Sequence, residues 1–491
     1  MKYLYNARFY CEDGFSDRVN ALLVDSGKIL KLLSPEDPVG ADWERIDLRG
    51  GWVYPGFIDA HTHSFSGGLY ENGVDLSNCC SIDEVLSLLF VAARQNPELV
   101  IGWRFDEGLI REKRFPTVKE LDSVCPGSRL LLRRVDGHSC VLNSKARQAV
   151  PGLSSQEEVL IAQDNDLAVN WLQDNCSEET ILQAYHSAAQ TALRGGFSTI
   201  HTMIGDAQQS VQHYSFIQNR LPEFAVNFVL YPQCFNLEAA LELGARRIGG
   251  CILADGSIGS RTAALSEAYS DGEGRGNLYQ SDQFWREFVM KAHQKGLQVC
   301  VHCIGDAAIR QINQAYANLP PDEVRELRHQ LIHCEFTPDP LVEEIAASGS
   351  VPVMQPAFDM LWGGPDGLYA QRLGNRHQSM NRFKTLAGKG IRVCGSSDWY
   401  VTDLNIAMSL HALIHHNNPA ERLSPAEAIG IYTKNNAWLN HDENVRGRIA
   451  EGFCADLSVM NADFTQALNW PDVRATFIFR SGEMAYAACQ T

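Results

Sequence analysis

The chain of 491 residues lacks long apolar runs, a basic excess and low-complexity segments. No stretch approaches the ~18 consecutive apolar residues that a membrane-spanning helix needs, so we expect no membrane as a partner. Lys and Arg number 42 against 59 Asp and Glu, giving a formal net charge of -17. Nucleic acids attract basic surfaces, and no basic stripe is present, so we expect no nucleic acid as a partner either. The expected partner is a small-molecule substrate, and the sequence leaves open whether the chain forms a homo-oligomer.

Signals for secretion are also lacking. The N-terminal segment MKYLYNARFYCEDG does not contain the uninterrupted apolar core of a signal peptide. The 14 cysteines are scattered along the chain and do not have the spacing of a small disulfide framework. Free thiols are typical of a reducing compartment, so we predict a cytoplasmic protein.

Short apolar runs recur along the chain with helical segments between them. Runs without polar alternation are typical of parallel strands buried on both faces. Amphipathic stretches at 282–296 and 339–349 read as helices that end near glycine. Eight strands alternating with helices predict an α/β fold, a (β/α)₈ TIM-type barrel. The eight runs are WVYPGFIDAH, FSTIHTM, AVNFVLY, GCILADG, LQVCVHCIGD, HQLIHCE, SVPVMQP and IRVCGSSD.

The count of eight requires that residues 64–190 lie outside the barrel. That stretch contains two further strand candidates, 99–105 and 129–138, and it is too long for an ordinary loop. We therefore predict an inserted subdomain over the barrel mouth at 64–190, with the barrel formed by 53–63 and 191–440. Both ends of the chain, 1–52 and 441–491, read as short strands joined by turns, and we expect them to pair into one small β-sandwich domain.

Polar residues follow the ends of several predicted barrel strands. In such barrels the chemistry lies at the carboxyl ends of the strands. A single histidine there is more often structural, but four imidazoles and a carboxylate on one mouth suit a borderline divalent cation, most plausibly zinc. We expect one or two Zn²⁺ per chain, with another divalent metal as the alternative. The residues are His61, His63, His302, His333 and Asp398.

Four segments, taken in order, resemble the metal motifs of the amidohydrolase superfamily: GFIDAHTH, VHCIGDAAI, LIHCEF and GSSDW. The wider context is similar to the branch called amidohydrolase family 3. The matching segments there are DGHSCVLNS (136–144), ADGSIGSRTAAL (254–265) and GRIAEGFCADLSVM (447–460). The similarity runs over almost the whole chain.

The resemblance implies a role for each of these residues. His61 and His63 would hold the more buried metal, with Asp398 as a further ligand that takes a proton from the attacking water and passes it to the leaving group. His302 and His333 would hold a second metal. In a one-metal site they would instead divide between ligation and polarising the substrate carbonyl. A bound cation acidifies water, and a carboxylate beside it can act as general base and acid.

One position departs from the family pattern. Four residues before the Asp-Gly of ADGSIGS, the branch usually has a lysine that is carboxylated and bridges two metals, and here that position is Cys251. A thiolate can also ligate zinc. The alternative is that Cys251 is a small buried filler and that the site keeps one metal.

Candidates for substrate binding are less specific. Asp255 and Arg261 follow the fourth barrel strand, where they would face a substrate or pair with each other to fix the loop. Asp136 and His138 belong to the insertion and would reach over the mouth, or would only cap a turn. Several aromatic residues near strand ends, Phe358 and Trp362 among them, would form pocket walls or plain core.

The predicted function is metal-dependent hydrolysis of a C–N bond, an amide or cyclic amide, of a small molecule. One alternative is a deaminase, which attacks a ring carbon and expels ammonia. Another is a non-catalytic binding protein that retains the fold, although a decayed site should lose its costly buried polar groups first.

Overall fold

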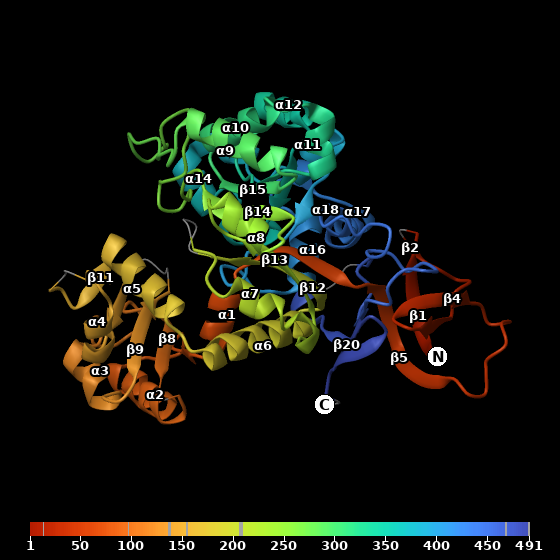
Figure 1. The fold of residues 1–491 in the computed structure, drawn as a ribbon, viewed down its shortest axis with the longest axis horizontal. Coiled ribbons are helices and arrows are strands. Elements are labelled where there is room, and N and C mark those ends of the chain that lie inside the picture. The colour runs from red at the N-terminus through yellow and green to blue at the C-terminus, as the bar shows by residue number, and fades with distance from the viewer. Residues whose placement is uncertain are drawn as a thin grey trace. The chain divides into compact units, whose positions relative to one another are not determined.

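The computed structural model describes residues 1–12, 14–96, 98–135, 139–153, 156–205, 210–466 and 469–489. Its chain divides into two compact units, shown in Figure 1. The first comprises Met1–His63 and Ala189–Thr491, and the second comprises Ser64–Ala188. Within the described ranges, no helix is both long and apolar enough to cross a membrane. The fold is mixed α/β, as predicted.

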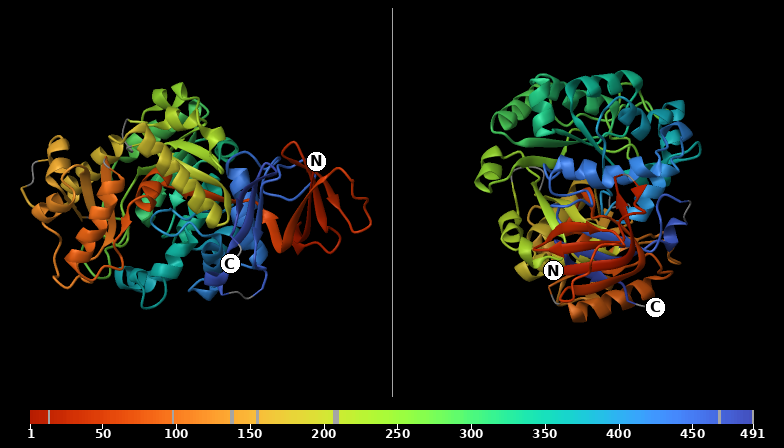
Figure 2. Two further views of the ribbon diagram at one scale, coloured as in Figure 1. Left: turned by 90° about the horizontal axis from the view of Figure 1, so that it is seen from below. Right: turned by 90° about the vertical axis from the view of Figure 1, so that its right-hand side faces the viewer.

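Strands from both ends of the chain form one mixed sheet in the first unit. The long strand β5 (Glu44–Pro55) joins them, because it pairs in parallel with β1 (Lys2–Cys11) and antiparallel with β19 (Leu457–Met460). Figure 2 shows the red N-terminal strands beside the blue C-terminal ones. The remaining strands are β2 (Gly14–Phe15), β3 (Ala21–Asp25), β4 (Lys28–Leu33), β20 (Ala475–Arg480) and β21 (Glu483–Ala487). The described ladders make a single sheet, so they do not show the predicted β-sandwich.

Eight parallel strands form the rest of the first unit's framework. Three of them make one sheet, in the order β13 (Asn227–Pro232), β12 (Phe197–Ile204), β6 (Phe57–Thr62). Five make a second sheet, β14 (Arg247–Leu253), β15 (Gln298–Cys303), β16 (Gln330–His333), β17 (Val351–Met354) and β18 (Cys394–Gly395).

Each of the eight apolar runs overlaps one of these strands. In β6, β12 and β15 every residue is buried, which agrees with coverage on both faces. A single parallel bridge between Thr62 and Trp399 brings the ends of the first and last strands together. The ladders themselves stay separate between β13 and β14, so closure into one barrel remains a prediction.

Helices follow the strands as the sequence indicates. The predicted helix at 282–296 is α9 (Asp282–Gln294), whose first turn is capped by the Ser281 side chain. The one at 339–349 is α12 (Asp339–Ser348), which ends at Gly349 in the left-handed conformation, φ 78°. Other helices after these strands are α7 (Tyr214–Gln218), α8 (Leu237–Glu242), α10 (Asp306–Ala317), α11 (Pro321–Leu327), α13 (Pro356–Trp362), α14 (Leu368–Leu373), α15 (Phe383–Gly388), α16 (Ile406–Ile414), α17 (Pro425–Gly430) and α18 (Asn436–Leu439).

The second unit has its own five-stranded sheet and its own core. The two extra strand candidates are β8 (Leu99–Phe105) and β9 (Arg129–Arg134), which pair with each other in parallel. They are flanked by β7 (Val74–Asp75), β10 (Ser139–Leu142) and β11 (Val159–Ile161). The helices are α1 (Ser64–Glu71), α2 (Ile82–Gln95), α3 (Val118–Val124), α4 (Ser144–Ala149) and α5 (Ala162–Asp174), and α6 (Glu178–Arg194) leads back toward β12.

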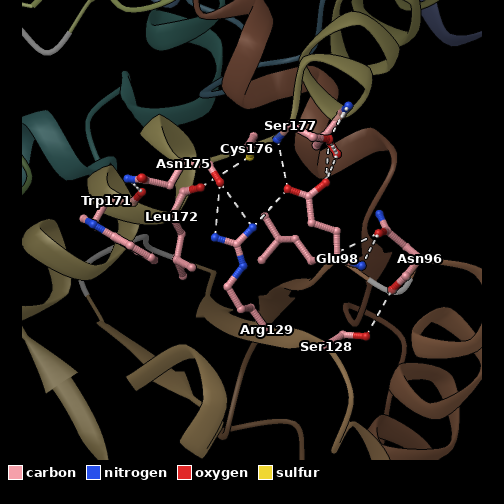
Figure 3. Close-up of polar contacts among 11 residues, drawn as sticks. Asn96, Glu98, Ser128, Arg129, Trp171, Leu172, Asn175, Cys176 and Ser177 are labelled. Carbon is pink, nitrogen blue, oxygen red and sulfur yellow. Dashed lines mark hydrogen bonds and ion pairs between the residues drawn. The ribbon is translucent and has the colours of Figure 1, made fainter. Parts of the chain in front are cut away.

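A partly exposed polar network around Glu98 holds the end of α5 to this sheet (Figure 3). Glu98 accepts hydrogen bonds from the backbone N–H of Ser177 at 2.9 Å and from Arg129 Nη2 at 3.0 Å. Arg129 also donates to the carbonyl oxygen of Asn175 at 3.2 Å. The turn between α5 and α6 is therefore fixed to the starts of β8 and β9.

Candidate metal centre

The predicted ligands lie at the carboxyl ends of parallel strands. His61 lies within β6 and His63 follows it; His302 lies near the end of β15 and His333 ends β16. Asp398 comes three residues after β18. Because parallel strands run in one direction, these ends meet at the same edge of the framework.

One carboxylate oxygen faces two imidazoles at this edge. Asp398 Oδ1 lies 3.2 Å from His61 Nε2 and 3.3 Å from His63 Nε2. His61 is fully buried and Asp398 nearly so. Neither His61 Nε2 nor Asp398 Oδ1 has a hydrogen-bond partner in the part of the chain that the structure describes. Buried polar atoms are almost always paired, so this convergence suits a cation held between them.

A second cluster surrounds a sulfur atom. Ligand atoms of Cys251, His61 and His333 all lie within 4.8 Å of one another. Cys251 Sγ is also 3.9 Å from His302 Nδ1. Imidazole nitrogen, thiolate and carboxylate form a donor set for a borderline divalent metal.

The charges in this pocket reinforce each other. Burial raises the pKa of Cys251, but contacts with His302, His333, His61 and His63 outweigh it and hold the pKa well below its ordinary value. Burial likewise works against ionisation of Asp398, yet the neighbouring imidazoles of His61 and His63 lower its pKa. The thiol and the carboxylate therefore favour the ionised forms that bind metal. Contacts with Asp398 and Cys251 outweigh burial and raise the pKa of His61, His63 and His302, whose protons must leave when a metal binds.

His333 is held in one tautomer by a partner that the sequence did not reveal. Gln355 Nε2 donates to Ser396 Oγ at 2.9 Å, which leaves Gln355 Oε1 to accept from His333 Nδ1, also at 2.9 Å. The Nε2 lone pair of His333 is then free, and that atom is buried with no hydrogen-bond partner among the described residues. Such a second hydrogen bond is what orients metal-binding histidines.

Asp59, also missed from sequence, ties the two ligand-bearing segments together. Its Oδ1 accepts the backbone N–H of His61 at 3.0 Å and its Oδ2 accepts that of Ser397 at 2.9 Å. The N–H of Asp398 in turn donates to the His61 carbonyl oxygen at 3.0 Å. Asp59 precedes His61 by two residues, so strand alternation alone could have placed it on the same face as the ligands.

The predicted substrate-binding residues have varied environments. Asp255 is fully buried and accepts three backbone N–H groups, from Ala264, Ile304 and Gly305. Burial raises its pKa to about 6. Arg261 pairs with Asp271 at 2.8 Å, so the alternative in which Asp255 and Arg261 pair with each other to fix the loop is wrong. Asp136 and His138 lie outside the described residues.

Aromatic side chains line one side of the cluster. The Phe358 ring stacks on His333, with centroids 6.2 Å apart, and Trp362 packs on Phe358. Tyr369 donates from its hydroxyl to Glu335 Oε2 at 2.7 Å. Burial raises the pKa of Glu335 to about 7. An apolar wall with few polar groups is typical of a small-molecule site.

The fold and this site point to one class of protein. The sequence profile of the Amidohydrolase family matches residues 44–470, most of the chain. The chain therefore belongs to the amidohydrolase family, which confirms the resemblance drawn from its motifs. The residue groups described above are ones that could hold a divalent metal as cofactor.

Individual relatives agree with this assignment. YtcJ of Bacillus subtilis, a protein named as an amidohydrolase, is 29% identical over 91% of this chain and 92% of its own. The N-substituted formamide deformylase of Arthrobacter pascens is 23% identical over 94% of this chain and 93% of its own. An uncharacterized metal-dependent hydrolase from Pyrococcus furiosus has the same fold, with a TM-score of 0.81 at 24% identity, covering 95% of this chain and 100% of that one.

Proposed function

We propose that this protein is a zinc-dependent hydrolase that cleaves a C–N bond, an amide or cyclic amide, of a small molecule. The observation that carries the proposal is the convergence of His61 Nε2, His63 Nε2 and Asp398 Oδ1, two of which are buried without hydrogen-bond partners in the described chain. The match to the N-substituted formamide deformylase covers nearly the whole chain, and the name of that protein supports the choice of a C–N bond.

In this proposal His61, His63 and Asp398 hold one cation. When bound, the cation lowers the pKa of a water molecule from 15.7 to about 7 and so supplies a nucleophile at neutral pH. Asp398 acts as general base, accepting the proton of the attacking water, and later as general acid, passing it to the leaving nitrogen. Its lowered pKa keeps the carboxylate ionised and ready to accept that proton.

Cys251, His302 and His333 form the second half of the site. With Cys251 as a thiolate ligand, the site holds two metals, and the sulfur takes the place of the family's lysine. If Cys251 is filler, the site holds one metal, and His333 polarises the substrate carbonyl. The low pKa of the thiol and its contacts with four imidazoles support the ligand role.

The wider architecture completes the proposal. We infer that the eight parallel strands close into a (β/α)₈ barrel, since Thr62 and Trp399 already bridge its first and last strands. The second unit, with Asp136 and His138, would cover the mouth of this barrel and shape substrate choice. Asp255 and Arg261 would present the loop after β14 to the substrate.

The test is activity against a panel of N-formyl and N-acyl amines and cyclic amides, using protein analysed for metal. Release of carboxylate and amine, abolished by a chelator and restored by Zn²⁺, would support the proposal. Ammonia release from aminated heterocycles, with no amide hydrolysis, would show a deaminase instead. Protein that binds no divalent metal even after reconstitution would contradict both and leave a binding protein.

A further inference from the structure

Positive charge gathers at the amino ends of the parallel strands, the edge opposite the candidate metal centre. Arg247 is the first residue of β14 and Arg246 precedes it. Arg328 comes just before β16, and Arg392 just before β18. The whole chain carries a formal net charge of -17, so a cluster of arginines is unusual for this protein. We call these four residues the arginine cluster.

Arg247 is the least expected member of the arginine cluster because its charge is buried. Its exposed fraction is 6%. The guanidinium carbon lies 4.8 Å from the centre of the Tyr231 ring, a cation–π contact. Yet among the residues that the structure describes, Nη1 has no hydrogen-bond partner and no carboxylate forms an ion pair with the side chain. A buried charge destabilises the fold unless it is paired, so a negative group bound beside this guanidinium would be stabilising.

Other members of the cluster extend the positive region toward solvent. Arg328 and Arg392 both lie against the Trp438 ring, at 4.4 and 4.2 Å from its centre. Arg328 is paired with Glu443, with Nη2 and Oε1 2.6 Å apart. Arg392 is exposed, and the structure gives it no ion pair with a described carboxylate. Among the described residues, the Arg328–Glu443 contact is thus the one ion pair that the four arginines form.

The pKa of a neighbouring histidine, His441, is lowered by burial and by the same positive charges. Burial lowers the pKa of His441, and the charges of Arg328, Arg247 and Arg246 lower it further, against a smaller opposing effect of Glu443. The guanidinium groups of Arg328, Arg247 and Arg246 therefore all lie close enough to His441 to act on its charge.

We propose that the arginine cluster is a binding site for a small oxyanion, carrying a carboxylate or phosphoryl group, with Arg247 as its anchor. The planar guanidinium fork matches both groups through paired N–H donors. Arg246 and Arg392, which are exposed, supply the attraction that brings the anion to the edge of the sheet. The site is independent of the metal centre and of the reaction proposed above.

The test uses the full-length protein and follows its thermal unfolding. Sodium phosphate and, separately, sodium acetate are titrated at ionic strength held constant with sodium chloride. We expect a saturable rise in Tm for the wild type with at least one of the two anions, since a ligand that binds only the folded state stabilises it. Comparing the two titrations shows whether phosphoryl or carboxylate is preferred.

Two variants and a control make the result specific. Arg247→Gln should abolish the anion-dependent rise, and Arg392→Gln, which alters an exposed side chain and decides the case if Arg247→Gln does not fold, should weaken apparent affinity several-fold. Arg325→Gln is the control, because Arg325 is an exposed arginine of α11 paired with Asp322. It should behave as wild type. Equal rises in all four proteins, or no rise beyond that given by chloride, would overturn the proposal and leave Arg247 solvated by water alone.

Discussion

At their carboxyl ends the parallel strands carry imidazole, thiolate and carboxylate groups, whereas at their amino ends they carry guanidinium groups. At the carboxyl edge two buried acceptor atoms, His333 Nε2 and Asp398 Oδ1, have no hydrogen-bond partner among the described residues. At the amino edge one buried donor atom, Arg247 Nη1, has no hydrogen-bond partner in the described part of the chain. Both edges belong to the same framework, so backbone geometry is shared and the difference lies in the side chains.

This contrast shows how the two ends of one set of strands can carry side chains suited to ligands of opposite charge. Unpaired acceptors favour a cation, and an unpaired donor favours an anion, because a buried polar group without a partner destabilises the fold. Each edge should therefore depend on the groups assigned to it.

The largest effect is expected from Asp398→Asn at the carboxyl edge. Losing the general base should lower kcat by about 10²–10⁴-fold. His61 and His63 should still bind metal, so metal content should fall much less than activity. Steady-state kinetics with elemental analysis on the same sample check this, with Asp366→Asn, at an exposed position, as the control. Near-normal turnover in Asp398→Asn would remove Asp398 from the role of base.

Cys251→Ala tests whether the sulfur is a ligand. We expect metal content to drop from two to one per chain, since His61, His63 and Asp398 still hold the first ion. In the Co²⁺-substituted protein, a thiolate-to-metal absorption band should disappear in Cys251→Ala and persist in Cys454→Ala. An unchanged stoichiometry and spectrum would mean that Cys251 is filler. Cys251→Lys in bicarbonate buffer is the complementary variant, expected to restore the second metal.

Asp59→Asn should weaken the metal centre without removing a ligand. An amide oxygen can accept only one of the two backbone N–H groups that Asp59 now accepts, from His61 and Ser397. Loss of such support around a metal typically costs about 10–100-fold in affinity. Competition with a chromophoric chelator measures the metal affinity of the variant and of the wild type. Unchanged affinity would show that His61 and Asp398 are aligned by other contacts.

The smallest effect concerns a histidine at the amino edge, just before β16. Burial, reinforced by His293, lowers the pKa of His329 from 6.5 to about 3, and its Nδ1 accepts the Val299 N–H at 2.9 Å. Because the unfolded chain binds a proton below pH 6.5 and the folded chain does not until about pH 3, the free energy of unfolding should fall as pH falls through this window. The slope due to this residue is at most about 1.4 kcal/mol per pH unit.

The measurement is urea unfolding of metal-free wild type and His329→Gln in buffers from about pH 7 to about pH 4. His329→Gln should show the shallower pH dependence. Parallel curves for the two proteins would mean that His329 has an ordinary pKa in the folded state.

Much of the framework could be read from the sequence because buried parallel strands have continuous apolar runs. Each of the eight runs overlaps a strand, and the helices near Gly296 and Gly349 end where expected. The motif order also led to the family. The sequence could not separate a sandwich from a single sheet, because pairing partners depend on how a long strand such as β5 is shared between the two ends.

The candidate site could be predicted where residue type and strand position coincide, as for His61 and Asp398. Contacts that depend on loop conformation could not be predicted from the sequence. Arg261 follows the same strand as Asp255, but the loop carries it to Asp271, and no spacing rule indicates that. Gln355 and Asp59 were missed because their importance lies in which backbone and side-chain atoms they meet. Arg247 was missed for a similar reason, since an arginine at the start of a strand is usually exposed.

The most direct test of the account is a crystal structure of the protein as purified, with metals located and identified by anomalous scattering at the zinc edge. The account predicts zinc within bonding distance of His61 Nε2, His63 Nε2 and an Asp398 oxygen, about 2.0–2.2 Å. A second zinc should lie near His302 and His333, with Cys251 Sγ about 2.3 Å from a metal. A site with no anomalous peak after reconstitution with zinc, in crystals where all these side chains are ordered, would contradict it.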